Sequence, residues 1–475
     1  MLLIFAVVTA VVAAAAGRWY YLDQRITKTG IPTTWISPLD IIRGNFEDIL
    51  IKITSFLDEN NGLAALRSPA GKPFIIANSP ELLCKILTGV PQRKLHANGV
   101  QNPLVGAFSP KLLKLERKVS SSIDDTSLNL FQILNDLFDE FGQREFSQKD
   151  KDETDTSEAL RDFWWKVRLT LIFGKVSWSE HTIMCCKTRF YAEVDQFASL
   201  LINMFPFAKY LPLPSTVYYR FTVWRLRNHL RSLINEFEAK KRVDCDNEWA
   251  LLHEAKRESI ELKIDLCMKM LFVGIGPLTD IVCWMLFHIA QDKEMQSAMA
   301  REIKAASTVN FKQITKLPIL DAVYKETLRM YAPVHVGRMT MVPQQLLRYN
   351  IPKDSDFMTN MHFVHRSKHY YENPNSFDYR RFLSKNGLAA KEFSSSNSSN
   401  KFMEQKKPFI PFGIGSRSCP GSMISGCIAK TFVTNLLSKY SLEFKDGAGK
   451  VATGYNLVMP IRPMNLKLKM RKRKD

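Results

Sequence analysis

Residues 408–421 read PFIPFGIGSRSCPG, and a helical pattern follows from Ser422 to about Tyr440. Glycines and prolines surround a single cysteine, Cys419, which indicates a tight, pre-shaped loop that ends at a helix N-terminus. Backbone N–H groups and the positive end of the helix dipole favour the thiolate form of a cysteine at such a place. A thiolate held in this way can act as a nucleophile or as a metal ligand, and the rest of the sequence has to decide between them.

Length, composition and charge bound the kind of protein. The 475 residues allow two or three average domains or one large domain, and 45% hydrophobic residues suffice for a sizeable core. The formal net charge of +19 fits a solvated basic surface, an anionic membrane, an acidic partner or nucleic acid. Basic residues are spread along the chain, with one cluster at 467–474, and no nucleic-acid motif is present. Nucleic acid is therefore not expected as a partner.

Cysteine usage indicates a reducing environment. The eight cysteines form no CxxC pair and no Cys/His cluster with zinc-finger spacing. Most lie unevenly spaced in apolar, helical surroundings, which predicts reduced core thiols in a body that faces the cytosol.

The first 22 residues predict a membrane anchor. Residues 1–16 are almost wholly apolar, and a helix continued to residue 22 spans the ~30 Å of a hydrocarbon core, with Trp19 to Tyr21 at the interface. The positive charges that follow this run place the N-terminus outside or in the lumen and the body in the cytosol. The alternative is a cleaved signal peptide, but no positive charge precedes the apolar run, which argues against it. Residues 23–40 then predict a hinge and residues 41–475 the catalytic body, with a Ser-rich insertion at 391–407 that we expect to be disordered.

The body is expected to be mostly helical. Residues 62–87 predict strand, turn, strand and helix, with Pro80 at the first helical position, and helices follow to about residue 332. Residues 149–158 predict a charged loop, and residues 266–290 a long apolar helix that is buried, not a membrane span, and is interrupted at 274–277. Strands are expected within 333–365, loops over 366–407, and one strand pair around 457–466.

Two further signals accompany the cysteine loop. Glu326 and Arg329 lie at i and i+3 on one face of a helix with apolar flanks, so both side chains are expected to be buried. A buried glutamate needs a partner, and the fork-shaped arginine can donate two hydrogen bonds to it. The third signal is Arg381, within the stretch 377–382, FDYRRF.

In this order and at these separations, the three signals resemble the cytochrome P450 family. The pattern Phe-x-x-Gly-x-Arg-x-Cys-x-Gly looks like the family's haem-binding loop, and Glu326, Arg329 and Arg381 resemble its Glu-Arg-Arg cluster. The resemblance extends from Gly62 to Met464, and the anchored start is similar to membrane-bound eukaryotic members, with fungal-like features. The loop pattern is carried by Phe412, Gly415, Arg417, Cys419 and Gly421.

The resemblance implies a mainly α fold with small β-sheets, a single large domain around a buried haem. The Cys419 thiolate would be the axial ligand of the iron of haem b. Arg417 and Arg338 would face haem propionates, although an ordinary arginine at a strand end remains the alternative for Arg338.

One departure from the family pattern lies in an early helix. The family's Trp-x-x-x-Arg is missing, since residues 84–160 contain no Trp. Arg117 or Lys118 could substitute for it, whereas His96 is more simply a surface histidine.

A second departure lies in the long apolar helix. Residues 273–280 read VGIGPLTD, so Gly276 and Pro277 occupy the positions of the family's acid and first threonine, which relay protons. Three candidates could replace them in the proton relay: Thr279, Asp280, or water held by backbone groups. Pro277 would free such backbone groups by opening the helix.

The resemblance implies a monooxygenase that takes electrons from NADPH through cytochrome P450 reductase and oxidises an apolar terpenoid, steroid or polyketide, as in secondary metabolism. It also implies an anchor in the endoplasmic reticulum membrane, and the +19 charge suits an acidic reductase. An isomerase or dehydratase that does not activate dioxygen is the alternative, because Pro277 replaces the threonine. A non-catalytic haem carrier is a third reading. A cysteine hydrolase is disfavoured because no histidine neighbours Cys419.

Overall fold

The computed structural model of the chain describes residues 20–35, 46–88, 112–118, 127–146, 156–173, 214–240, 251–384, 408–445 and 453–473, with short gaps. The gaps include residues 69–70, 113, 116–117, 273, 307–310, 333–334, 416–417 and 457–458. Residues 1–16, 36–45 and 385–407 lie outside this part of the chain. The membrane anchor and the Ser-rich insertion therefore stay predictions. Of the hinge expected at 23–40, only residues 36–40 lie outside the described part; residues 23–27 are helical, and Thr33–Trp35 form a strand that pairs with the strand Leu63–Ser68.

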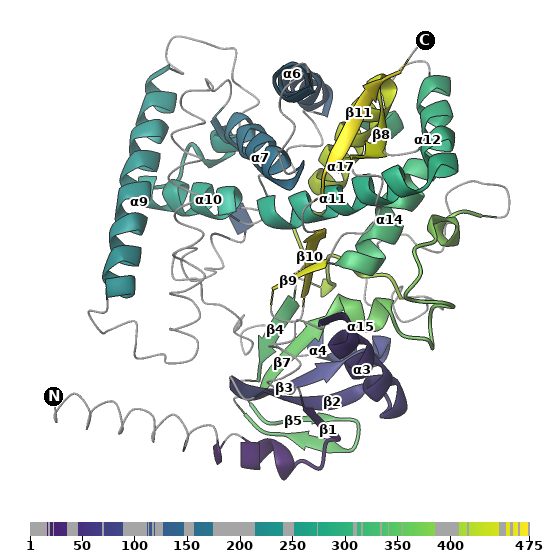
Figure 1. Cartoon of the computed structure of the whole chain (residues 1–475). Helices are drawn as coiled ribbons and strands as arrows, with labels where there is room; N and C mark the ends of the chain where they lie inside the picture. Colours follow the sequence, from purple (N-terminus) through teal and green to yellow (C-terminus); the bar gives the residue numbers. More distant parts are fainter. Residues whose placement is uncertain are drawn as a thin grey trace.

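A five-stranded sheet forms one end of the molecule (Figure 1). Its spatial order is β1-β2-β3-β7-β4, with β1–β2 and β3–β7 parallel and β2–β3 and β4–β7 antiparallel. Strands β2 and β3 are the two strands expected after Gly62, which confirms that prediction. The strands are β1 Thr33–Trp35, β2 Leu63–Ser68, β3 Gly71–Ala77, β4 His335–Met339 and β7 Asp356–Asn360.

Three helices pack beside this sheet: α3 Phe46–Glu59, α4 Pro80–Thr88 and α15 Met361–His365. Helix α4 begins at Pro80, as the sequence predicts, and its apolar side chains join the core under the sheet. A second small core joins α3 to β2, β3 and α15. The short helix α15 was not expected from the sequence, and it carries a residue that is central to the site below.

The helical body holds the main hydrophobic core (Figure 1). Helix α11 crosses its middle, packed against α7, α14 and α17, and α9 lies at one side against α10. The mainly α architecture with small β-sheets in a single domain is confirmed. The helices are α6 Ser127–Phe146, α7 Thr156–Phe173, α9 Pro214–Lys240, η4 Leu251–Ala255, α10 Ile260–Phe272, α11 Ile275–Gln291, α12 Lys293–Ala305, α13 Phe311–Ile314, α14 Pro318–Tyr331, η5 Tyr379–Phe382 and α17 Ser422–Lys439.

Three two-stranded pairs complete the described fold. They are β5 Gln344–Leu346 with β6 Tyr349–Ile351, β8 Tyr440–Phe444 with β11 Leu468–Lys472, and β9 Thr453–Asn456 with β10 Met459–Pro463. The strand pair expected around 457–466 is thus β9–β10, shifted toward the N-terminus. The β8–β11 pair was missed because β11 lies inside the basic cluster at 467–474. There Lys469 and Arg471 point to solvent while Leu468 and Met470 are half-buried, which is the period-2 pattern of a strand.

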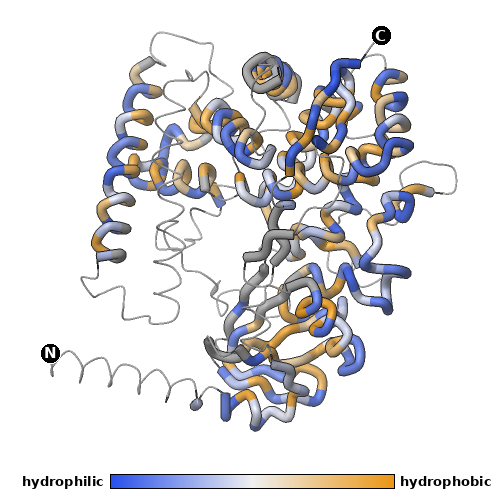
Figure 2. Tube along the Cα trace, in the orientation of Figure 1, coloured by the Kyte–Doolittle hydropathy of each residue, from blue (hydrophilic) through white to orange (hydrophobic). Residues whose placement is uncertain are grey.

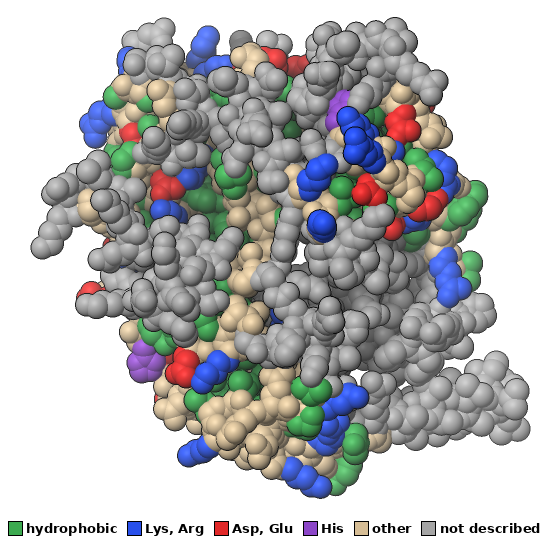
Figure 3. Space-filling view, turned by 180° about the vertical axis from the view of Figure 1, so that it is seen from behind, with side chains coloured by type: hydrophobic (Ala, Val, Ile, Leu, Met, Phe, Trp, Pro, Cys, Tyr) green, Lys and Arg blue, Asp and Glu red, His purple; other side chains and the backbone are tan. Residues whose placement is uncertain are grey.

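The apolar segment 260–291 is the stretch among the described residues that is long and apolar enough to cross a membrane, but 75% of its 18-residue apolar stretch is buried inside the protein. The prediction of a core helix is confirmed, and Figure 2 shows α10 and α11 as largely hydrophobic elements at the centre of the body. Basic side chains lie at several separate places on the face seen in Figure 3, with acidic ones between them.

The interruption of this segment lies within the expected residues 274–277, but the effect expected of Pro277 is wrong. The break lies at Gly274, which has φ +104° and precedes the first residue of α11. Pro277 does not open the helix, because it stands in the first turn, where a backbone N–H has no partner within the helix anyway. A smaller correction concerns residues 156–158, which form the start of α7 and not the end of a charged loop.

Candidate functional site

The cysteine loop is a series of tight turns in front of α17. The N–H of Gly413 donates to the carbonyl of Ile410 at 2.9 Å, and the N–H of Cys419 donates to the carbonyl of Phe412 at 2.9 Å. Gly413 and Gly415 have φ of +71° and +77°, a left-handed conformation that favours glycine. The pre-shaped loop expected from the sequence is therefore present, and it ends at the N-terminus of α17.

The two predicted loop glycines differ in whether their surroundings require glycine. A Cβ added at Gly415 would stand 2.8 Å from Cγ2 of Thr88 on α4, so both the backbone conformation and the close approach require glycine there. A Cβ added at Gly421 would stand 3.8 Å from Sγ of Cys419, which is an ordinary contact. Gly421 therefore lies beside the sulfur, and Gly415 fixes the loop against α4.

Cys419 is the exposed cysteine of the described part of the chain, and its thiol forms no disulfide. Burial raises the pKa of the Cys84 thiol and raises the pKa of the Cys267 thiol to about 12, so these groups stay protonated. The prediction of reduced core thiols is confirmed for the four buried cysteines, which are Cys84, Cys267, Cys283 and Cys427.

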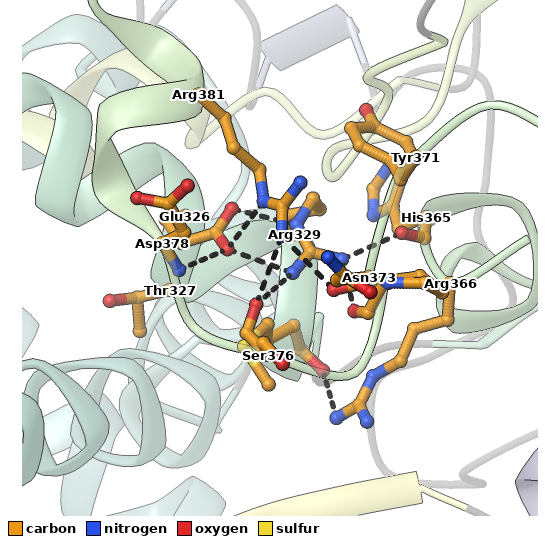
Figure 4. Close-up of polar contacts among 12 residues, drawn as sticks. Glu326, Thr327, Arg329, His365, Arg366, Tyr371, Asn373, Ser376, Asp378 and Arg381 are labelled. Carbon is orange, nitrogen blue, oxygen red and sulfur yellow. Dashed lines mark hydrogen bonds and ion pairs between the residues drawn. The ribbon is translucent and has the colours of Figure 1, made fainter. Parts of the chain in front are cut away.

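Glu326 and Arg329 form a fully buried, bidentate ion pair on α14 (Figure 4). Arg329 donates from Nε at 2.7 Å and from Nη2 at 2.8 Å to the two carboxylate oxygens of Glu326. The N–H of Asp378 donates to the same carboxylate at 2.8 Å. The apolar flanks of the helix thus predicted the burial correctly, and the two charges satisfy each other away from water.

The rest of the Arg329 fork holds the following irregular segment. Its Nη1 donates to the carbonyls of His365 and Pro374 at 2.8 and 2.7 Å. Arg381 approaches Glu326 at 3.3 Å from its Nε and donates to the carbonyl of Asn373 at 3.0 Å. The three predicted cluster residues therefore lie together, and they fix the chain from α15 to η5 as one unit.

This cluster is connected to the start of the cysteine loop through Tyr371. The guanidinium of Arg329 lies 5.2 Å from the centre of the Tyr371 ring, and the Tyr371 hydroxyl donates to the carbonyl of Pro408 at 2.9 Å. Sequence reasoning missed Tyr371 and His365, which lie in a stretch expected to be plain strand and loop. Their only sequence signal is a run of aromatic and histidine residues at 361–371, MHFVHRSKHYY.

Helix α17 is joined to α14 by a second buried contact. Lys430 of α17 binds the carboxylate of Asp321, and its ammonium lies 5.2 Å from the centre of the Tyr324 ring. Gly426 permits this approach, because a Cβ there would stand 3.3 Å from the same ring. The helix that follows the cysteine loop is thus held by the helix that carries Glu326 and Arg329.

The four residues predicted on the long helix have different environments. Thr279 is 1% exposed, and its hydroxyl donates to the carbonyl of Ile275 at 2.7 Å. Asp280 is also buried, at 7% exposure. Gly276 is exposed, and a Cβ added to it would meet no atom within 4 Å, while Pro277 is half-buried. The open surface of this turn therefore belongs to Gly276 and Pro277.

The remaining predicted residues are placed as follows. Arg338 is buried on β4, where it pairs in register with Phe357 of β7. Phe412 is half-buried in the cysteine loop, and Lys118 is exposed. Arg417, His96 and Arg117 lie outside the described residues, so their predicted roles stay predictions.

The donors present fit a haem iron better than an isolated metal ion. A metal ion bound by protein alone needs three or more ligands, and the described residues contain no such group of His, Cys, Asp and Glu. One exposed cysteine is sufficient for an iron whose equatorial positions are filled by a macrocycle. Cys419 would hold the iron, and Arg338 and Arg417 are the arginines that the sequence predicts to bind the propionates.

Comparison with known proteins points in the same direction. The model of the family described as Cytochrome P450 matches residues 114–468. The chain is 27% identical to mitochondrial sterol 26-hydroxylase of Mus musculus, over 40% of this chain and 35% of that protein. It is 28% identical to berbamunine synthase of Berberis stolonifera over 38% of this chain and 36% of that protein, and 29% identical to a cytochrome P450 monooxygenase of Clonostachys rogersoniana over 41% and 39%. The matched part thus spans less than two fifths of these relatives' length.

Proposed function

The chain belongs to the cytochrome P450 family, and from this premise we propose that it is a haem-thiolate monooxygenase that inserts one oxygen atom of dioxygen into an apolar small molecule. The observation that carries the proposal is the exposed Cys419 thiol, set in front of α17 by a loop that Tyr371 and His365 connect to the buried Glu326–Arg329 pair. Haem b, when bound, supplies the oxygen chemistry, which a thiolate ligand promotes by donating electron density to the iron.

The chain's own residues have three tasks in this proposal. Cys419 holds the iron as a thiolate, because it lies at a helix N-terminus, beside Gly421. Arg338, buried on β4, and Arg417 bind the propionates. Glu326, Arg329 and Arg381 hold the segment on which the loop rests, so they are positioning residues.

The test is the spectrum of the reduced protein with carbon monoxide. We expect a strongly red-shifted Soret band in the wild type and its loss in Cys419→Ala, because the band reports thiolate ligation of the iron. Retention of haem with an imidazole-type band in both proteins would overturn the proposal. A pyridine haemochrome assay on the same samples identifies the macrocycle as haem b.

One observation favours a second candidate function, a haem-thiolate isomerase or dehydratase. The first turn of α11 offers Gly276 and Pro277 where the family carries an acid and a threonine, and the Thr279 hydroxyl is bonded within its own helix. In the monooxygenase, water held by the backbone of this turn would deliver protons to the reaction. Thr279 and Asp280 would supply protons to that water. Product formation that needs neither NADPH nor dioxygen would favour the second candidate.

The substrate, partner and location follow as parts of the same proposal. Relatives include sterol and steroid hydroxylases and an ent-sandaracopimaradiene 3-hydroxylase, which supports a terpenoid, steroid or polyketide substrate in secondary metabolism. NADPH–cytochrome P450 reductase would supply the electrons, and the charge of +19 favours an acidic flavoprotein. We further propose that residues 1–22 anchor the protein in the endoplasmic reticulum membrane and that 23–40 link them to a cytosolic catalytic domain.

A further inference from the structure

The segment 408–410, which leads into the cysteine loop, is held by side chains from two places. The backbone N–H of Ile410 donates to Nε2 of His365 at 3.0 Å. Two residues earlier, the carbonyl of Pro408 accepts from the Tyr371 hydroxyl at 2.9 Å. Between them the Phe409 ring stacks on the imidazole of His365, with ring centres 5.5 Å apart. The entry to the loop therefore depends on side-chain partners, and His365 provides two of these contacts.

The imidazole of His365 is suited to be a hydrogen-bond acceptor. It is fully buried, and burial together with the charge of Arg329 lowers the pKa of His365 to about 3, so the ring is neutral at physiological pH. Because Nε2 accepts from Ile410, the single ring proton stands on Nδ1. If the ring were protonated, its Nε2–H would face the N–H of Ile410, and two donors cannot form a hydrogen bond.

The backbone of His365 is fixed independently of its side chain. Its carbonyl accepts from Nη1 of Arg329 at 2.8 Å, and Arg329 is itself clamped by both oxygens of Glu326 (Figure 4). His365 is the last residue of α15, so the helix also limits where its Cα can move. The residue is thus held by the cluster on one side and holds the loop on the other.

From Ile410 the contacts continue to the cysteine. The carbonyl of Ile410 accepts from the N–H of Gly413 and closes the turn that carries Phe412. The carbonyl of Phe412 then accepts from the N–H of Cys419 at 2.9 Å. A displacement of Ile410 therefore changes the position of the group to which the backbone of Cys419 is bonded.

We propose that His365 is a positioning residue for Cys419, acting by accepting the Ile410 N–H while Arg329 holds its own carbonyl. The importance of this role for the iron rests on the proposed function, in which Cys419 is the ligand. Glu326 and Arg329 act on the loop through His365 and Tyr371, and not by direct contact with it.

The test compares two uncharged replacements that differ in reach. In His365→Gln the side-chain oxygen can stand near the position of Nε2 and accept from Ile410, whereas in His365→Asn it stops near the position of Nδ1. Amide hydrogen exchange is measured in a fragment that covers residues 408–412, in which only Phe409, Ile410 and Phe412 carry a backbone N–H. We expect exchange at Ile410 to be about tenfold faster or more in the Asn variant and close to wild type in the Gln variant.

His288 offers a matched control. It is a buried histidine whose Nε2 lies 3.0 Å from the Tyr331 hydroxyl, and burial likewise lowers its pKa to about 3 although a side-chain hydrogen bond with Gln291 opposes the shift. His288→Asn and His288→Gln should lower global stability similarly without changing exchange at Ile410. Equal exchange at Ile410 in the two His365 variants, whether fast or slow, would overturn the proposal. If the Asn variant does not accumulate, exchange at Ile410 is compared between His365→Gln and His288→Gln. Faster exchange in His365→Gln would then overturn the proposal.

The spectrum with carbon monoxide connects the loop to the iron. We expect a larger imidazole-type fraction in His365→Asn than in His365→Gln, and equal fractions would show that the bond does not position Cys419. If even the wild type lacks the thiolate band, the proposed function fails. The exchange measurement, which needs no assumption about the ligand, still decides whether His365 holds the loop.

Discussion

At the scale of single residues, two glycines near the start of α11 differ in what they can be replaced by. Gly274 has φ +104°, and a Cβ there would stand 2.7 Å from Nη2 of Arg168 on α7. Gly276 has no such conformation and no atom within 4 Å of an added Cβ. Gly276, where the family carries an acid, therefore has room for a side chain, whereas Gly274, where the helix breaks, does not.

We expect Gly276→Asp to fold normally, since an acid in the first turn of a helix is favourable. If the proposed monooxygenase lacks a proton donor here, the acid should raise the product formed per NADPH by about tenfold, below the ~100-fold of a well-placed acid. The measurement is product and NADPH consumption under saturating dioxygen. Gly274→Ala is the contrast, with a loss of unfolding free energy of about 1–2 kcal/mol from the left-handed backbone alone. A Gly276→Asp protein with unchanged product per NADPH would speak against proton supply at this turn.

At the scale of elements, the position of the cysteine depends on how α14 holds α17. Lys430 of α17 binds the buried carboxylate of Asp321 on α14, and Lys325 binds the same carboxylate at 2.8 Å. Burial acts to raise the pKa of Asp321, but the charges of Lys430 and Lys325 outweigh it, so the pKa is lowered. This contact ties α17, which follows Cys419, to α14. The start of the loop is tied to α14 as well, through His365 and Arg329, so both ends of the loop depend on this helix.

We expect Lys430→Met to destabilise the protein by about 3 kcal/mol, the lower end for breaking a buried pair, because Lys325 remains. An aspartate with a lowered pKa contributes stability above the unfolded pKa of about 3.9 and loses it as pH falls through the folded value. The difference from wild type should therefore be constant between about pH 5 and 7 and shrink below about pH 4. Thermal unfolding at several pH values measures it, with the more exposed Lys325→Met as control. A difference that grows on acidification would contradict this account.

At the scale of the whole molecule, several histidines are buried in the neutral form. Burial lowers the pKa of His288 and of His365 to about 3, and burial together with Arg366 lowers the pKa of His362. In the unfolded chain each would titrate near 6.5. The unfolded chain therefore binds more protons than the native protein between these values, so stability is complete above about pH 6.5 and falls on acidification.

We expect the free energy of unfolding to fall below pH 6 by about 1.4 kcal/mol per pH unit for each such histidine. His288→Phe should reduce this slope by the contribution of one histidine, about 1.4 kcal/mol per pH unit, because the other two histidines keep their environment. Denaturant unfolding followed by tryptophan fluorescence between pH 4.5 and 7 measures the slope. A slope in the variant equal to that of the wild type would show that His288 is charged in the native protein.

The sequence alone determined the parts of this protein that depend on local chemistry. Turn residues, apolar periodicity and the i, i+3 spacing identified the cysteine loop, the buried Glu326–Arg329 pair, the β2–β3 hairpin and the core nature of 260–291, because each signal lies within a few neighbouring residues. The break at Gly274 lies within the interruption expected at 274–277, whereas the expected opening of the helix by Pro277 was wrong, since Pro277 falls in the first turn of α11.

Only the tertiary structure decided how these parts meet. That Arg329 holds the carbonyl of His365, and that the imidazole of His365 holds Ile410, depends on contacts across 36 and 45 residues of chain. Such contacts leave no periodic pattern, because a single histidine at the end of a five-residue helix has no repeat to detect. The cysteine was therefore evident from sequence, whereas the residues that hold its loop in place were decided by the fold.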